Sequence, residues 1–179
     1  MKVYTISKFS SLKKSANRTS SWVYIELPKN IEEICENFWD KIEEDDLFKE
    51  EADNGIETEP HVTVKYALLN EDVKEIRDVL KGERNGFVEL VDTALFPADE
   101  YEVLKITVNS EDLDRIHEKL NRLPHQDRFH IYNPHITLAY LKKGRGKKYV
   151  GKLNNNKTFE FSELYFENSN KTYKISLEK

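Results

Sequence analysis

The chain has 179 residues, of which 34% are charged and 38% are hydrophobic, and its formal net charge at pH 7 is −5. This length is enough for one domain with a proper core, or for one domain of two lobes. The acidic balance argues against binding of duplex DNA by bulk charge, and no apolar run approaches the ~20 residues that cross a membrane. The single cysteine, Cys35, excludes an internal disulfide and suits a reducing compartment, so we expect a cytoplasmic protein without a membrane partner.

The first residues differ in charge from the rest of the chain. Residues 1–20 contain five basic side chains and no acidic one, which leaves a net charge of −10 for the remainder. We interpret residues 1–20 as a basic N-terminal arm and residues 21–179 as a single domain of two lobes. The sequence leaves the role of the arm and the oligomeric state open.

Residues 21–27 alternate between apolar and other side chains, as a strand does. The apolar side chains are those of Val23, Ile25 and Leu27. The opposite face carries two aromatic side chains, Trp22 and Tyr24, followed by Glu26. Aromatic rings on that face either cover a lobe boundary or stack on a base, which is worth ~1–3 kcal/mol per base in sites for single-stranded nucleic acid.

Apolar side chains at spacings of three and four predict three helices. The first covers residues 30–48, and Asn30 with Glu33 forms a capping box at its start. Asn70 caps the second helix, whose first turn is acidic. Ser110 caps the third helix. We interpret the single cysteine, which lies in the apolar stripe of the first helix, as a packing residue.

Four further stretches read as strands. Residues 86–95 and 101–108 form one predicted hairpin, and residues 158–167 and 171–178 form another around the polar turn at 168–170. Helices therefore alternate irregularly with hairpins along the chain. This order predicts the α+β fold class.

One stretch occurs twice in the sequence. Residues 60–66 read PHVTVKY and residues 134–140 read PHITLAY, with the two histidines 74 positions apart. Both copies read as strands with proline at the entry. A single His-x-Thr is usually an ordinary strand feature, but a coincidence would have to preserve both polar residues, both flanks and the same face. The repeat predicts two similar lobes related by a pseudo-two-fold axis through a groove.

Each copy places its polar residues on one face of its strand, because side chains alternate with period two. His61, Thr63 and Lys65 share one face of the first copy, and His135 and Thr137 share one face of the second. The apolar residues between them point the other way, into a core. Two such strands side by side would surround one groove with two imidazoles and two hydroxyls.

This constellation suits acid–base chemistry on a phosphate. An unperturbed histidine pKa of ~6.5 leaves one ring easily neutral and another easily protonated at neutral pH. One ring can take a proton from an attacking hydroxyl while the other gives one to a leaving oxygen, typically worth ~10²–10⁴-fold in rate. The threonines can donate hydrogen bonds to the non-bridging oxygens, where charge builds up. Lys65 is expected to add positive charge beside His61.

A metal site is the main competing interpretation, because histidine is a common ligand. Catalytic zinc usually has three protein ligands, and the sequence has neither a His-Glu-x-x-His motif nor a cysteine pair. His125 and His130 precede His135 closely, but no predicted helix holds them. We interpret both, and His117, as structural or exposed, and we expect neither metal nor cofactor. The absence of Gly-x-Ser-x-Gly argues against a serine hydrolase of that type.

A basic run, residues 142–148, follows directly on the second motif strand and contains five positive charges and two glycines. It reads either as a solvated hairpin turn or as a phosphate contact supplied by side chains such as Lys143 and Arg145. Its position next to the motif is the argument for phosphate contact.

The paired His-x-Thr strands resemble those of the two-histidine (2H) phosphoesterase superfamily. That group includes 2′-5′ RNA ligase-like proteins, RNA-end cyclic phosphodiesterases and phage anti-CBASS nucleases. The resemblance spans residues 21–173 in outline and implies a bilobal fold, with two pseudo-symmetric antiparallel sheets flanking a central groove and helices outside. It also implies metal-independent phosphodiesterase activity, in which His61 and His135 are the acid and base, in either order, and Thr63 and Thr137 hold the phosphate.

The wider context of the motifs, residues 57–63 and 132–144, is most similar to the phage-borne branch. Its members cleave cyclic oligonucleotide signals that trigger bacterial antiviral defence. The resemblance implies the same activity here, in the host cytosol if the protein is phage-encoded, with a ribose 2′-hydroxyl as the internal nucleophile. It also implies a base-stacking aromatic, here Trp22 or Tyr24, and an acidic residue in a late strand, for which Glu163 is the candidate.

Two other functions stay open. One is an RNA-end enzyme, either a 2′,3′-cyclic phosphodiesterase or a 2′-5′ RNA ligase-like protein, and the other is a non-catalytic nucleotide-binding sponge. A basic track leading away from the histidines would favour RNA, whereas a closed, aromatic-lined pocket would favour a cyclic dinucleotide. The expected partner is thus a small nucleotide or an RNA end, and the overall acidity favours the small substrate.

Overall fold

A computed structural model describes residues 20–52, 55–126, 131–153 and 157–179. The predicted basic arm, residues 1–20, therefore lies outside the described residues except for its last position. Within these ranges no helix is both long enough and apolar enough to cross a membrane.

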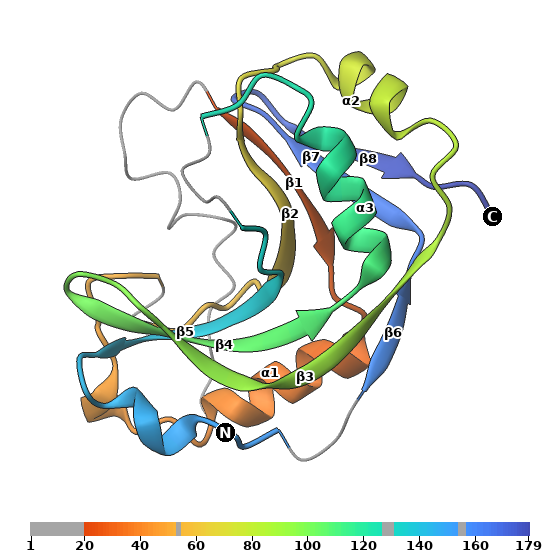
Figure 1. Ribbon diagram of the computed structural model, residues 1–179. Coiled ribbons are helices and arrows are strands. Elements are labelled where there is room, and N and C mark those ends of the chain that lie inside the picture. Colours follow the sequence, from red (N-terminus) through yellow and green to blue (C-terminus); the bar gives the residue numbers. More distant parts are fainter. Residues whose placement is uncertain (1–19, 53–54, 127–130, 154–156) are drawn as a thin grey trace.

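In the described part of the chain, eight strands form one curled antiparallel sheet in the order β6-β3-β4-β5-β2-β1-β7-β8 (Figure 1). The strands are β1 (Ser21–Glu26), β2 (His61–Leu68), β3 (Gly86–Pro97), β4 (Tyr101–Asn109), β5 (His135–Lys142), β6 (Thr158–Phe161), β7 (Glu163–Glu167) and β8 (Thr172–Ser176). The helices are α1 (Lys29–Trp39), α2 (Val73–Leu80) and α3 (Glu111–Leu120), with 3₁₀ turns η2 (Glu44–Asp46) and η3 (Gly146–Tyr149).

The sheet order is symmetrical about the boundary between β5 and β2. Outward from this boundary, β4 corresponds to β1, β3 to β7 and β6 to β8. The two motif strands therefore lie at the centre, each at the inner edge of a four-stranded half. The predicted bilobal α+β fold is confirmed, with the two expected sheets joined edge to edge through the pair Val62 and Ile136.

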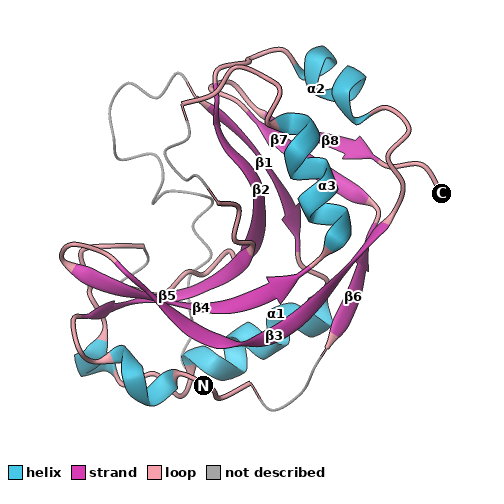
Figure 2. Ribbon diagram, viewed as in Figure 1, coloured by secondary structure: helices cyan, strands magenta, loops and turns pink. Residues whose placement is uncertain are grey.

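The two faces of the sheet differ in what covers them. Helix α1 follows β1 in sequence but packs near β5, and α3 follows β4 but packs on β2 and β3 (Figure 2). Their apolar residues join Val62 and Ile136 in one core. We call this helix-covered side the outer face of the sheet. The inner face is the opposite side, which carries His61 and His135.

Helix α1 is shorter than predicted and starts differently. Its N-cap is Pro28, with no side-chain hydrogen bond, so the predicted capping box at Asn30 is wrong because Asn30 already lies in the first turn. The helix ends at Trp39, and the chain then turns into η2. Asp46 of η2 is buried and accepts a hydrogen bond of 2.8 Å from the Tyr149 hydroxyl. This contact with η3 draws the segment away from the helix axis.

Of the predicted caps of the other two helices, one is wrong and one is confirmed. Helix α2 is capped by Asp72, whose side chain accepts a hydrogen bond of 2.8 Å from the Lys74 N–H, so the predicted cap at Asn70 is two residues early. Helix α3 is capped by Ser110, as predicted, through a hydrogen bond of 3.1 Å from the Leu113 N–H. A cap of this kind stabilises a helix by about 1 kcal/mol.

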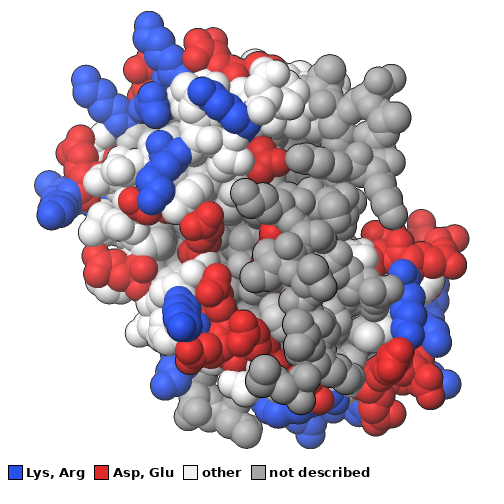
Figure 3. Space-filling view, turned by 180° about the vertical axis from the view of Figure 1, so that it is seen from behind, with Lys and Arg blue, Asp and Glu red and all other residues white. Residues whose placement is uncertain are grey.

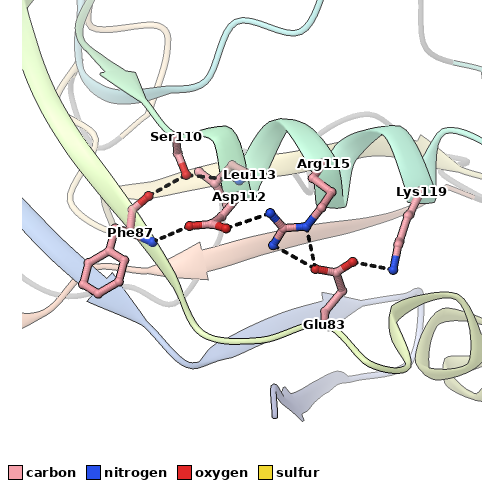
Figure 4. Close-up of polar contacts among 7 residues, drawn as sticks. All are labelled: Glu83, Phe87, Ser110, Asp112, Leu113, Arg115 and Lys119. Carbon is pink, nitrogen blue, oxygen red and sulfur yellow. Dashed lines mark hydrogen bonds and ion pairs between the residues drawn. The ribbon is translucent and has the colours of Figure 1, made fainter. Parts of the chain in front are cut away.

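Polar contacts fix α3 to β3, as Figure 4 shows. Ser110 donates to the Phe87 carbonyl at 2.6 Å, and Asp112 accepts from the Phe87 N–H at 3.0 Å. Glu83 is buried and is bound by both Arg115 and Lys119. Burial alone would raise the pKa of Glu83, but these two cations hold it below its usual range. The network sets the position of the helix that follows β4.

The predicted strand over residues 158–167 is two strands. Ser162 separates β6, which pairs with β3, from β7, which pairs with β1, so the chain passes from one half of the sheet to the other. The buried side chains change parity at this point. They are those of Phe159, Phe161, Leu164 and Phe166. This change in the alternation was the signal for a break.

Candidate active site

The two motif strands meet at their N-terminal ends. Val62 of β2 pairs with Ile136 of β5, and both side chains are fully buried on the outer face. In this antiparallel register His61 stands opposite Thr137 and Thr63 stands opposite His135. Opposite residues have Cβ atoms about 5 Å apart. The repeat therefore brings two imidazoles and two hydroxyls to one patch of the inner face.

Both motif strands contain a bulge at the same offset from the histidine. The register of β1 with β2 shifts at Val64, and that of β4 with β5 shifts at Leu138. Beyond a bulge, the alternation of side chains reverses. Lys65 consequently points to the outer face, where it is 1% exposed and donates to Asn121 Oδ1 at 2.7 Å. The prediction that Lys65 adds charge beside His61 is therefore wrong.

Both histidines are oriented by the same hydrogen bond. His61 Nδ1 lies 2.9 Å from the Glu59 carbonyl oxygen, and His135 Nδ1 lies 2.7 Å from the Asn133 carbonyl oxygen. A carbonyl oxygen only accepts, so each Nδ1 carries the hydrogen and donates it. In the neutral rings Nε2 is therefore the basic nitrogen. Each motif thus presents the same ring nitrogen for proton transfer.

Both histidines are half-buried, and desolvation favours the neutral form of each ring. Desolvation lowers the pKa of His61 to about 4. The hydrogen bond to the Glu59 carbonyl opposes this shift, and the charge of His135 adds a smaller lowering. Desolvation also lowers the pKa of His135, and the positive charge of Lys105 lowers it further. The hydrogen bond to the Asn133 carbonyl opposes these two effects. Each Nε2 can therefore accept a proton. A bound phosphate would favour protonation of a neighbouring ring, because opposite charges stabilise each other.

Aromatic side chains of β1 form the wall beside His61. The ring centroids of Trp22 and Tyr24 lie 5.0 and 5.5 Å from that of His61, both edge-on, and the two rings stack on each other at 4.3 Å. Tyr24 also stacks on Tyr165 of β7 at 5.4 Å. Trp22 and Tyr24 are only 6% and 1% exposed. They lie next to the catalytic candidate as expected, but their buried rings hold the imidazole instead of offering an open face to a base.

Glu163 lies on the inner face of β7, because its neighbour Leu164 is buried in the core. Its carboxylate forms an ion pair of 2.8 Å with Lys174 and accepts a hydrogen bond of 3.3 Å from the Tyr165 hydroxyl. The Lys174 contact holds the pKa of Glu163 below its usual range. Glu163 is thus connected to the aromatic wall through Tyr165.

The basic run does not reach the histidines. Lys143 follows the far end of β5, eight residues from His135, which corresponds to about 26 Å at ~3.3 Å per strand residue. Arg145 Nε lies 4.0 Å from Asp46, and Lys148 lies 2.7 Å from the same carboxylate. The expected phosphate contact of Lys143 and Arg145 is therefore wrong, and the run forms a turn in contact with acidic side chains.

The other histidines have structural partners where the structure describes them. His117 Nδ1 lies 2.7 Å from the Val64 carbonyl, and its ring stacks on Tyr132 at 4.0 Å. His125 Nδ1 lies 2.8 Å from the Leu123 carbonyl. His130 lies outside the described residues. Among those that are described, no three histidine, cysteine or acidic side chains are grouped as metal ligands would be.

Three further residues, Lys105, Thr107 and Tyr132, lie near the site, and the motifs alone do not indicate them. Lys105 of β4 pairs with Thr137, and Thr107 of the same strand pairs with His135. Tyr132 donates a hydrogen bond of 3.1 Å from its hydroxyl to the Thr63 carbonyl. The alternation of polar and apolar residues in 101–108 already placed Lys105 opposite the core. What was missing was the knowledge that β4 lies next to β5.

A hollow of about 660 Å³ adjoins the His135 side of the site. Its lining includes Thr107, Asn133 and Pro134, which pair with or precede His135, and acidic residues such as Glu89 and Asp114. The volume is within the usual range of small-molecule sites.

Comparison with protein-family models matches residues 37–167 to the 2′-5′ RNA ligase superfamily. A search of curated protein sequences found no significant match. Similar solved structures include the protein TT0787 of Thermus thermophilus, with 14% identity, a TM-score of 0.58, and coverage of 89% of this chain and 95% of that chain. Kluyveromyces marxianus Usb1 has 12% identity, a TM-score of 0.59, and coverage of 89% and 99%.

E. coli LigT complexed with 3′-AMP has 14% identity, a TM-score of 0.60, and coverage of 89% of this chain and 95% of that chain. At these identities the structural likeness shows the fold alone. The family match, by contrast, covers more than two thirds of the chain and includes both His-x-Thr motifs. The chain therefore belongs to the 2′-5′ RNA ligase superfamily, a group of 2H phosphoesterases.

Proposed function

We propose that this protein is a metal-independent phosphodiesterase that cleaves cyclic di- or oligonucleotides. The observation that carries the proposal is the central strand pair. It sets His61 opposite Thr137 and Thr63 opposite His135 on one face, and both imidazoles are oriented through Nδ1 in the same way. Two neutral rings with equivalent Nε2 atoms are suited to giving and taking one proton each.

The proposed step is an internal transesterification. One Nε2 removes the proton from a ribose 2′-hydroxyl, whose oxygen then bonds to the adjacent phosphorus. The bond from phosphorus to the 5′-oxygen breaks, and the other histidine, protonated beside the bound phosphate, gives its proton to that oxygen. Thr63 and Thr137 hydrogen-bond the non-bridging oxygens. The product is a linear nucleotide with a 2′,3′-cyclic phosphate.

Charge and surroundings support a small substrate. The net charge of −5 disfavours a long polyanion, and the basic run contacts acidic residues at the far end of β5. Among the described residues on the face shown in Figure 3, acidic and basic side chains are interspersed and do not form one basic track. Two aromatic rings of β1 lie beside His61. In this proposal the protein removes a defence signal, and it acts in the host cytosol if it is phage-encoded.

An RNA-end 2′,3′-cyclic phosphodiesterase or 2′-5′ RNA ligase-like enzyme is the second candidate. It is supported by the family description and by similar structures that hold single nucleotides. These are E. coli LigT complexed with 3′-AMP and Kluyveromyces marxianus Usb1 with uridine monophosphate. The same histidines and threonines would serve this reaction.

Turnover of a substrate panel in EDTA tests the proposal. The panel contains 3′,3′-cyclic GMP-AMP, cyclic tri- and tetra-adenylate, and RNA ending in a 2′,3′-cyclic phosphate. We expect cleavage of the cyclic oligonucleotides, lost in His61→Ala but retained in the matched control His125→Gln, because His125 is bridged to Leu68 at the far end of β2.

Each alternative has its own outcome in this panel. Cleavage of the RNA end alone would assign the protein to RNA processing. Tight binding without turnover would overturn the enzyme proposal and leave the nucleotide-binding sponge.

A further inference from the structure

One basic side chain on the inner face, that of Lys105, lies beside the site. Lys105 pairs with Thr137 and its neighbour Thr107 pairs with His135, so Lys105 points to the same face as the second motif. Only 5% of the residue is exposed. Lysine is almost never this buried unless it is paired.

The ammonium group of Lys105 has no counter-charge in the described part of the chain. Within those ranges its Nζ forms neither a hydrogen bond nor an ion pair. The other buried lysine, Lys65, donates to Asn121 at 2.7 Å. Burial lowers the pKa of Lys105, and its charge also lowers the pKa of His135. A lysine that is this little exposed and lacks a counter-charge costs stability, and its place beside the second motif points to a functional role.

The equivalent position in the other half of the pseudo-symmetric sheet does not carry a cation. Tyr24 pairs with Thr63 in the first half as Lys105 pairs with Thr137 in the second. The two halves therefore match in their histidines, threonines and bulges but differ at this position. A phosphate between Thr63 and Thr137 would meet a phenol ring on one side and an ammonium group on the other.

We propose that Lys105 binds a non-bridging oxygen of the substrate phosphate and neutralises the charge that builds up there during cleavage. This inference rests on the proposed function, because it uses the same phosphate position. Lysine suits this task, since its ammonium is a compact charge with three donors that can follow the phosphate as it changes geometry. The unpaired cation of the unliganded protein then becomes a charge-assisted contact in the complex.

Calorimetric titration with 3′-AMP, inorganic phosphate and adenosine tests the proposal, because adenosine shares the nucleoside of 3′-AMP but lacks its phosphate. The variants are Lys105→Met, which keeps the length of the side chain, and Lys105→Gln as a second neutral variant. Lys74→Met, at an exposed position of α2, is the matched control. We expect both Lys105 variants to weaken binding of 3′-AMP about tenfold to a hundredfold and to leave adenosine binding unchanged. We also expect Lys105→Met to melt no lower than the wild type.

The outcomes separate this inference from the proposed function. Phosphate-dependent binding that is equal in Lys105→Met and the wild type would overturn the role of Lys105 and leave the phosphodiesterase proposal intact. A lower melting temperature with unchanged 3′-AMP affinity would assign Lys105 to packing and overturn the inference. Absence of phosphate-dependent binding in the wild type, together with absence of turnover, would overturn both.

Discussion

The half-buried imidazole of His61, whose neutral form is favoured by desolvation, should make the unliganded fold sensitive to acid. Its pKa is about 4 in the folded protein, against 6.5 for an unperturbed ring. The unfolded chain binds a proton as the pH falls below 6.5, whereas the folded protein does so only near pH 4. The stability due to neutral His61 is therefore complete above pH 6.5 and is lost between pH 6.5 and 4. At ~1.36 kcal/mol per pKa unit, the loss is about 3 kcal/mol.

Denaturant unfolding at pH 7, 6, 5 and 4 measures this loss. His61→Asn is the suitable variant, because its amide can still donate to the Glu59 carbonyl that accepts from His61 Nδ1. We expect the wild type to lose about 3 kcal/mol more than His61→Asn between pH 7 and pH 4. Carboxylates also titrate in this range, but they change the stability of both proteins equally, so their contribution cancels in the comparison. Equal losses in the two proteins would refute the argument from burial.

Three other changes test separate parts of the structure. Tyr132→Phe removes the hydrogen bond to the Thr63 carbonyl and should lower the free energy of unfolding by about 1 kcal/mol. Urea denaturation measures this change, and unchanged stability would argue against a role for this contact. Asp46→Asn replaces a buried carboxylate bound by Lys148 and should cost roughly 1–3 kcal/mol in the same assay. Lys143→Ala should leave KM within about twofold, because ~26 Å exceeds the ~8 Å screening length of physiological salt, and a large rise in KM would restore the basic run to the site.

The fold and the four central residues were predictable from the sequence because the repeat carries both the pattern and its spacing. Pro, His, Thr and Tyr at matched offsets indicate two equivalent strands, and two equivalent strands at the centre of a sheet indicate two halves. The match of His61 with His135 needed no knowledge of the other strands. The cap at Ser110 was also predictable, because it depends only on local hydrogen bonds.

The sequence misleads where a contact between distant segments decides the outcome. Strict alternation predicts that Lys65 lies beside His61, but the bulge at Val64 reverses its face. No local residue pattern predicts that bulge. Proximity in sequence to the motif predicts that Arg145 reaches the phosphate, but β5 carries it away from the histidines. Lys105 shows the converse case. It is distant from both motifs in sequence and joins them only through the pairing of β4 with β5.

In the proposed reaction His61 and His135 transfer protons while a ribose 2′-hydroxyl attacks the phosphate. The most direct measurement is the cleavage rate of 3′,3′-cyclic GMP-AMP and of its 2′-deoxy analogue in EDTA, with the wild type, His61→Ala and His135→Ala. We expect the wild type to cleave only the ribose substrate, and each variant to be slower by ~10²–10⁴-fold. Equal cleavage of the deoxy analogue, or full activity in either variant, would contradict the account.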